Sequence, residues 1–265
     1  MSRKNFAEIL SESGVEIEKE YERLIHMYYI DPSYGGTLDD YVEKQFNECP
    51  FKGTCISLGD FDDTHGFSFP RQISSKDIDT LILFCEYSCN MLSFGTDNPS
   101  SRNKKQRYYQ QVHRVMDLIC YDKFRKDGLI LFAPKSQAVS IAAQSVSAPI
   151  SYKVIEYNHH SLRGDIEAKK TILKMFADQL EARRDDLSSA NRSLCADLFM
   201  LFNNLNIRHN NVDRNSPSYK RVVAEMSKDD LEEWYDNTYM LCMEAFVTLD
   251  NGHIKDAVKN LKQDL

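Results

Sequence analysis

The chain has 265 residues, of which 42% are hydrophobic and 28% are charged, and its formal net charge is -7. This hydrophobic fraction is enough for a folded core, and no apolar run approaches the roughly 18 residues that a membrane-spanning helix needs. The N-terminal sequence MSRKNFAEIL lacks the apolar region of a signal peptide, and seven cysteines, an odd number, do not form a disulfide pattern. We therefore expect a cytoplasmic protein with one large domain or two ordinary ones.

The first half of the chain has apolar residues at helical spacing, interrupted by clusters of glycine, proline and aspartate. Thr37 is a good N-cap for the second helical segment, and Ser74 or Ser75 caps the third. These patterns predict helices over residues 6–29, 37–47, 74–90 and 103–124, loops with one short strand over 49–70, and a polar loop over 93–102.

The second half begins with short elements and continues with leucine-rich helices. The apolar run 129–132 predicts a buried strand that Pro134 ends, residues 136–146 a small helix, and residues 150–155 an extended piece after Ala148-Pro149. Two leucine stripes predict a helical hairpin over 162–205 with its turn at 183–189, followed by a loop over 206–218. Ser227 and Asp230 resemble a capping box that opens a last helix ending at Asn251. Its predicted buried face consists of Leu231, Trp234, Thr238, Leu241, Ala245 and Leu249.

The charge is unevenly distributed along the chain. Residues 1–63 carry six basic and 14 acidic side chains, and residues 215–265 carry six basic and ten acidic ones. Residues 99–126 carry eight basic and only two acidic side chains, with Tyr108, Tyr109, Tyr121 and Phe124 among them. This segment predicts contacts to RNA phosphates and stacking on bases, and the alternative is a solvated helix face with buried aromatic rings. The predicted RNA-binding residues in it are Arg102, Lys104, Lys105, Arg107 and Arg114.

The chain contains cysteines and histidines, which are the side chains that bind zinc in proteins. Four thiolates, from Cys49, Cys55, Cys85 and Cys89, are enough for a zinc ion, but short knuckle spacing is absent and the last two lie on an apolar stripe. His159-His160 lacks the spacing that places two histidines on one helical face. The chain has no glycine-rich phosphate loop, no G-x-S-x-G and no H-E-x-x-H. These absences exclude most familiar enzyme classes, and zinc remains a third hypothesis.

The segment LFNNLNIRHNN, residues 201–211, combines an arginine, a histidine and several asparagines. Arginine stabilises the extra charge on phosphorus when a 2′-hydroxyl attacks it, and histidine moves the proton. Asn204, Asn210 and Asn211 are predicted to bind RNA. The alternative is that Arg208 and His209 cap the C-terminus of a helix.

From about Tyr157 the chain resembles the HEPN superfamily, especially the C-terminal regions of abortive-infection proteins of the AbiJ type. The resemblance is carried by the charged helix 162–184, by LFNNLNIRHNN and by LEEWYDNTYMLCMEAF. It implies a helical bundle over 158–265 that dimerises, preceded by a mostly helical region of unknown role over 1–157 with a few short strands. Many HEPN domains are metal-independent endoribonucleases of toxin–antitoxin and phage-defence systems, so it also implies catalysis by Arg208 and His209 without metal or cofactor.

The family motif is an arginine, a polar residue and, four to six positions later, a histidine. Here Arg208 matches the arginine and His209 fills the polar position, but residues 210–219 contain no histidine. Two hypotheses therefore stand. The first is an HEPN-like endoribonuclease, and the second is a noncatalytic HEPN-like dimerisation or sensing module, with a cognate antitoxin or sensor as the partner that such systems imply.

Overall fold

The structure is a computed structural model that describes residues 16–31, 36–74, 77–97, 99–146, 148–251 and the single positions 258, 261 and 262. It is mainly helical with one two-stranded antiparallel hairpin, as the sequence predicted. The chain divides into two compact units, Met1–Phe132 and Ala133–Leu265, called unit 1 and unit 2 below. Among the described residues, no helix is long and apolar enough to cross a membrane.

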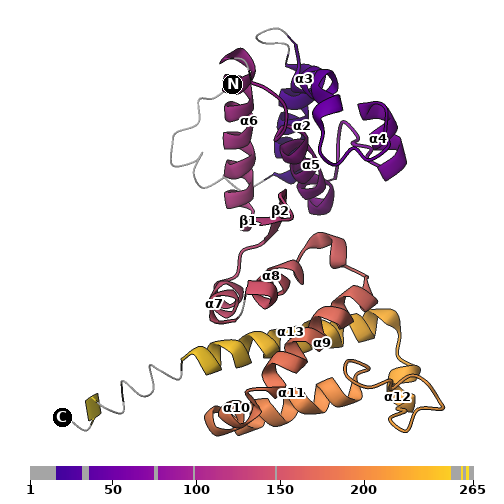
Figure 1. The fold of residues 1–265 in the computed structure, drawn as a ribbon, viewed down its shortest axis with the longest axis vertical. Coiled ribbons are helices and arrows are strands. Elements are labelled where there is room, and N and C mark those ends of the chain that lie inside the picture. The colour runs from indigo at the N-terminus through magenta and orange to yellow at the C-terminus, as the bar shows by residue number, and fades with distance from the viewer. Residues whose placement is uncertain are drawn as a thin grey trace, which may run out of the picture. The chain divides into compact units, whose positions relative to one another are not determined.

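Unit 1 packs its helices around an aromatic core. Tyr28, Phe84 and Tyr108 have no exposed surface, and the ring of Tyr28 lies within 6 Å of the other two. Figure 1 shows α2, α5 and α6 of this unit side by side, and contacts join α2 to both of the others. The elements are α2 (Ile17–Ile25), η1 (His26–Ile30), α3 (Leu38–Gln45), η2 (Phe46–Glu48), α4 (Leu58–His65), α5 (Ile78–Met91), α6 (Pro99–Leu118), β1 (Tyr121–Lys126) and β2 (Leu129–Pro134).

Capping side chains begin several of these helices. The capping box that Thr37 forms with Asp40 confirms the predicted start of α3. α5 begins after Asp77, whose carboxylate accepts from the Thr80 N–H, so Asp77 takes the place predicted for Ser74 or Ser75. The predicted helix 6–29 is described only from residue 16, where it forms α2 and η1.

Three predictions for unit 1 were wrong. α6 begins at Pro99, inside the loop predicted over 93–102. Loops were predicted over 49–70, but Ser57 caps the short helix α4 and Gly66, with a φ of 72°, ends it. The helix predicted to reach residue 124 ends at Leu118, and Cys120 takes a positive φ of 59°. Residues 121–126 then form β1, because a turn at Asp127-Gly128, with φ of 49° and 86°, pairs them with the buried strand β2.

Unit 2 is a helical bundle built on its longest helix. α13 packs against α7, α9, α10 and α11, and Figure 1 shows it crossing the bundle next to α9. Phe176, Phe202 and Phe246 lie in the core between these helices. The elements are α7 (Gln137–Ser145), α8 (Ala148–Glu156), η3 (His160–Leu162), α9 (Ile166–Glu181), α10 (Arg184–Ala190), α11 (Arg192–Asn204), α12 (Arg221–Ala224) and α13 (Lys228–Asp250).

The N-cap at Ser227 is confirmed, but its hydroxyl donates to the Asp230 carboxylate and the second bond of a capping box is not formed. α9 and α11 pack together as the predicted hairpin, but residues 184–190, predicted as its turn, form the short helix α10. Three further details of unit 2 differ from prediction. Residues 150–155 lie in α8 rather than in an extended piece, because Pro149 falls in the first turn of a helix, where its missing N–H costs nothing. On α13, Trp234 is 45% exposed and Tyr235 is fully buried in its place. The unit begins at residue 133 and not at 158, because α7 and α8 pack in the same bundle as α9 and α13.

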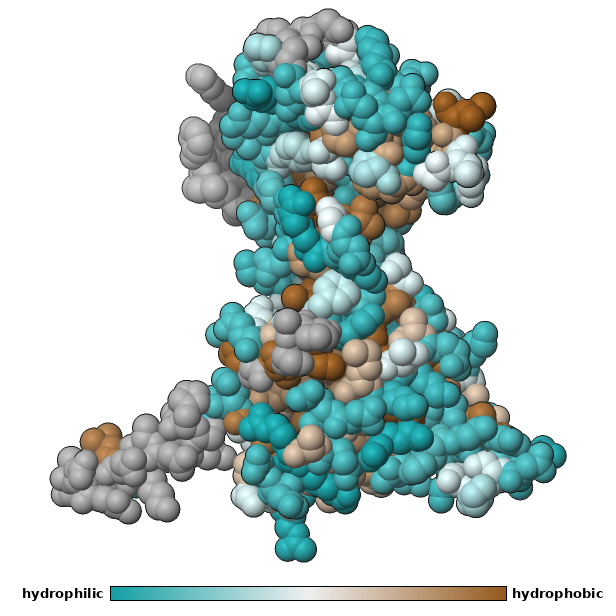
Figure 2. Space-filling view, in the orientation of Figure 1, coloured by the Kyte–Doolittle hydropathy of each residue, from teal (hydrophilic) through white to brown (hydrophobic). Residues whose placement is uncertain are grey.

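The surface of both units is mostly polar. On the face drawn in Figure 2, hydrophilic residues cover most of each unit, with isolated hydrophobic residues among them. Exposed large apolar side chains of unit 2 include Met200, Val222 and Met240. Isolated apolar residues of this kind are normal on a protein surface and need no functional explanation.

Candidate functional site

The loop that follows α11 positions the Arg-His pair. The Arg208 N–H donates to the carbonyl of Phe202 over 3.0 Å, which satisfies an acceptor at the C-terminal end of α11. Asn206 takes a positive φ of 59° at this point, a conformation that asparagine adopts more readily than most residues. The chain therefore turns sharply after α11 and presents Arg208 and His209 at the end of the helical hairpin.

Arg208 forms an ion pair that the sequence analysis did not predict. Its Nη1 lies 2.5 Å from Oε2 of Glu181, at the C-terminal end of α9, and Arg184 Nη1 lies 3.3 Å from Oε1 of the same carboxylate. The Arg184 guanidinium also lies over the ring of Phe199, 4.3 Å from its centroid. One carboxylate therefore holds two guanidinium groups, and the cluster carries one excess positive charge. In the sequence, this cluster is indicated only by Glu181 close to Arg183-Arg184 at the end of a predicted helix.

His209 follows Arg208 in the loop after α11, and two of the predicted asparagines lie in the same segment of the chain. The side chain of His209 is exposed and forms no hydrogen bond or ion pair with any residue that the structure describes. Asn204 donates to the Met200 carbonyl over 2.8 Å, and the Asn210 side chain accepts from the Asp213 N–H over 3.2 Å. Both asparagines are at least partly exposed, so all three residues are accessible from solvent.

Asn211 holds the loop together and does not face solvent. It has no exposed surface, and its side-chain oxygen accepts from the Asn206 N–H over 2.7 Å. Its amide nitrogen donates to the carbonyls of Asn203 and Ser218. The RNA-binding role predicted for Asn211 does not fit this geometry, because its polar side-chain atoms are already used inside the protein.

The basic segment of α6, in unit 1, divides into exposed and internal side chains. Arg102, Arg107 and Arg114 are exposed. Lys105 is buried, paired with Asp97 over 2.8 Å, and lies over the ring of Tyr41. Lys104 donates to two backbone carbonyls, and burial lowers its pKa. The two lysines therefore stabilise unit 1, and only the three arginines are available for the predicted RNA contacts.

The aromatic rings of this segment are less accessible than the stacking prediction requires. Tyr108 has no exposed surface, and its hydroxyl donates to Ser88 over 2.8 Å. Tyr109 is partly buried, and its hydroxyl donates to the Cys89 carbonyl. The alternative of a solvated helix face over buried rings describes these two tyrosines.

The four cysteines of the zinc hypothesis do not come together. Cys49, Cys55, Cys85 and Cys89 are all buried, but among the described residues no three of them place their sulfur atoms within ligating range. Burial raises the pKa of the Cys85 thiol well above its ordinary value and that of Cys89 to about 12. These thiols act as small apolar side chains of the unit 1 core.

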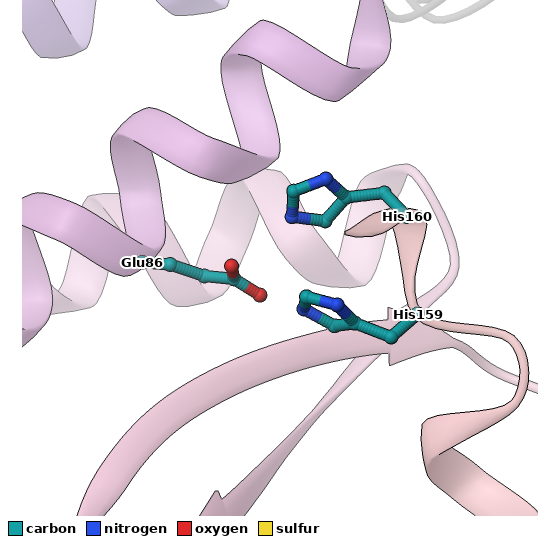
Figure 3. A group of neighbouring side chains, drawn as sticks. All are labelled: Glu86, His159 and His160. Atoms are coloured by element: carbon teal, nitrogen blue, oxygen red, sulfur yellow. The ribbon is translucent and has the colours of Figure 1, made fainter. Parts of the chain in front are cut away.

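His159 and His160 form a pair in the segment after α8. Figure 3 shows their rings beside one another, and their centroids lie 4.3 Å apart. His159 Nδ1 lies 2.7 Å from the hydroxyl of Ser161, which fixes the orientation of that ring. The third side chain in Figure 3, Glu86, belongs to α5 of unit 1, whereas both histidines belong to unit 2.

Comparisons with family models, with curated proteins and with solved structures found no match to this chain.

Proposed function

We propose that unit 2 is a metal-independent endoribonuclease module of the HEPN type, serving a phage-defence or toxin–antitoxin system. The observation that carries this proposal is the pair of guanidinium groups, Arg184 and Arg208, held by the Glu181 carboxylate beside the exposed His209. Two arginines with one excess charge bind a phosphodiester, and an imidazole can accept and donate a proton during the reaction.

The chemistry requires attack of the RNA 2′-hydroxyl on the adjacent phosphorus. His209 takes the proton of the 2′-hydroxyl, the new bond closes a 2′,3′-cyclic phosphate, and the bond to the 5′-oxygen breaks. The leaving 5′-oxygen needs a proton in return. The resemblance to HEPN domains, which dimerise so that two motifs share one cleft, assigns that proton to His209 of a second copy. Arg208 and Arg184 stabilise the charge that builds on the phosphate oxygens.

The test uses the full chain, an end-labelled single-stranded RNA and a chelator in excess. We expect cleavage to products with 2′,3′-cyclic phosphate and 5′-hydroxyl ends. Arg208→Ala and His209→Ala should each lower the rate by roughly 100-fold or more, the usual contribution of a group that transfers a proton or binds the transition state. Arg192→Ala and His26→Ala replace exposed residues outside the loop and the basic segment, and serve as matched controls. Intact RNA across salt and protein concentrations, or equal rates in all four variants, would refute the proposal.

Two observations favour the second candidate, a noncatalytic dimerisation or sensing module. Residues 210–219 lack the second histidine of the family motif, and Arg208 is already paired with Glu181. This candidate predicts a dimer by sedimentation analysis, with no RNA cleavage under any of the conditions above. A cellular toxicity that His209→Ala abolishes, without loss of the dimer or the fold, would refute it.

Three arginines of unit 1, Arg102, Arg107 and Arg114, are proposed to guide RNA. This role requires only exposed positive charge on one helix and is independent of the cleavage step. Replacing all three by glutamine should weaken RNA binding and reduce its dependence on salt.

A further inference from the structure

Unit 2 contains an open cavity of about 650 Å³ that the proposed function does not use. Residues 157–160, Arg163, Lys169 of α9 and the first turns of α13 line it, together with Pro134. Its size falls within the range of small-molecule sites. Lys169 and Glu181 are 12 positions apart on α9, so the cavity lies about 18 Å along this helix from the Arg208 cluster.

A buried lysine fixes the wall of this cavity. Lys169 is 95% buried, and its Nζ lies 2.6 Å from Glu232 and 2.7 Å from Asp236. The Tyr157 hydroxyl donates to the same Oδ1 of Asp236 over 3.0 Å, and the Gly164 N–H donates to Glu232 over 2.8 Å. Burial alone would raise the pKa of Glu232, but its hydrogen bonds from Lys169 and Gly164 lower it. The hydrogen bonds therefore hold both carboxylates in fixed orientations, and the lowered pKa keeps Glu232 ionised.

Further acceptors face the cavity without a protein partner. Asp229, Glu233 and Asn237 line it, and their side chains form no hydrogen bond or ion pair within the described part of the chain. Tyr157 and Lys169 both bind Oδ1 of Asp236, which leaves its Oδ2 for a ligand. Four carboxylates and two cations, Lys169 and Arg163, line the cavity, so with neutral histidines its charge is -2. A ligand that satisfies these groups is a cation with several N–H donors.

The spacing of the carboxylates selects the shape of that cation. Asp229, Glu232, Glu233 and Asp236 follow one face of α13 over about 10 Å, given the helical rise of 1.5 Å per residue. Among the described residues, no three of them bring their oxygens within the ligating range of a single metal ion. A ligand whose positive charges are spread along an aliphatic chain matches this row of carboxylates, and a single metal ion does not. Met240, which also lines the cavity, offers an apolar surface for methylene groups.

We propose that this cavity binds a linear aliphatic polyamine, with its ammonium groups on the carboxylates of α13. The proposal goes beyond the proposed function and does not depend on it, because it concerns other residues and is read out by binding. The probe is spermidine, titrated calorimetrically into the full chain at low ionic strength. We expect saturable binding with one site per chain that weakens as salt is added.

Matched variants decide whether the cavity is the site. The double variant Asp229→Asn/Glu233→Gln removes two carboxylates that have no protein partner, and it should weaken spermidine binding roughly tenfold while the circular dichroism spectrum stays unchanged. The control Asp185→Asn/Asp197→Asn removes two exposed carboxylates elsewhere in unit 2, and it should bind like the unaltered chain.

Three results would overturn the proposal. The first is no saturable binding of spermidine, and the second is equal weakening in the two double variants, which would indicate nonspecific attraction. The third is saturable binding of Mg²⁺ alone with the same loss in Asp229→Asn/Glu233→Gln, which would indicate a metal site.

Discussion

Asparagine residues with similar sequence surroundings have different roles in the loop after α11. Asn206 and Asn211 exchange hydrogen bonds between backbone N–H and side-chain oxygen in both directions, over 2.7 and 3.2 Å. Asn210, which lies between His209 and Asn211, has an exposed side chain. All three residues are asparagines within six positions, so residue type alone does not distinguish a fold residue from a candidate contact. Basic side chains of α6 differ in the same way, because Lys105 is buried and Arg107 is exposed.

The first prediction concerns the stability of this loop. Asn211→Ala leaves the Asn206 N–H and the carbonyls of Asn203 and Ser218 without their partner in a buried position. We expect it to lower the free energy of unfolding by about 3 kcal/mol, because unsatisfied buried polar groups pay their full desolvation cost. His209→Ala, at an exposed side chain without a partner, is the control and should leave the free energy unchanged. Urea denaturation measures both, and a loss of less than about 1 kcal/mol for Asn211→Ala would contradict the structural role assigned to it.

At the scale of elements, two helices bring acidic side chains together in unit 1. Asp39 lies in the first turn of α3 and Asp62 lies on α4, where the Tyr87 hydroxyl donates to its carboxylate. Burial, and then the charges of Asp62 and Glu43, raise the pKa of Asp39 from 3.8 to about 6. The α4 helix was absent from the sequence prediction, so this proximity could not be expected from the sequence.

The second prediction is a pH dependence that follows from this pair. Between about pH 4 and pH 6 the folded state keeps the proton on Asp39 that the unfolded chain releases, so stability falls as pH rises through this window. Asp39→Asn should remove this part of the decrease and make the protein more stable than the unaltered chain at pH 7. Asp117→Asn, at an exposed position on α6, is the control. Thermal denaturation at a series of pH values measures the effect, and parallel stability curves for Asp39→Asn and the unaltered chain would rule it out.

At the scale of the whole molecule, each unit has a hydrophobic core of its own. The core of unit 1 contains Phe84 and the rings around it, and the core of unit 2 contains Phe176 and Phe246. The single tryptophan of the chain, Trp234, lies on α13 in unit 2. Its fluorescence therefore reports on unit 2, whereas far-ultraviolet circular dichroism reports on the helices of both units.

The third prediction uses this reporter. Phe176→Ala and Phe84→Ala each remove a fully buried ring, which costs about 3–5 kcal/mol in the core affected. We expect Phe176→Ala to lower the denaturation midpoint measured by Trp234 fluorescence. Phe84→Ala should shift part of the circular dichroism transition and leave the fluorescence midpoint in place. Equal shifts of the fluorescence midpoint in the two variants would show that the cores do not unfold separately.

Sequence alone determined the helical class, the two leucine-rich helices that pack as α9 and α11, and the helix starts at Thr37 and Ser227. It placed a turn over 183–189, where the structure has α10. These features depend on side chains close together in the sequence: apolar residues at a spacing of three and four, and an oxygen that caps an N–H three positions later. The short elements were mispredicted. A helix of eight residues at α4 and a hairpin at β1–β2 are stabilised by packing on neighbouring helices more than by their own pattern.

Only the tertiary structure decided the composition of the candidate sites. Glu181 and Arg208 are 27 positions apart, and Lys169 is more than 60 positions from Glu232 and Asp236, yet each set forms ion pairs. Ion pairs between distant residues depend on how helices pack, and no local pattern encodes their distance or burial. The sequence proposed Arg208 and His209 from their chemistry. The fold added the carboxylate that holds Arg208, assigned Asn211 to the interior and formed the cavity along α13.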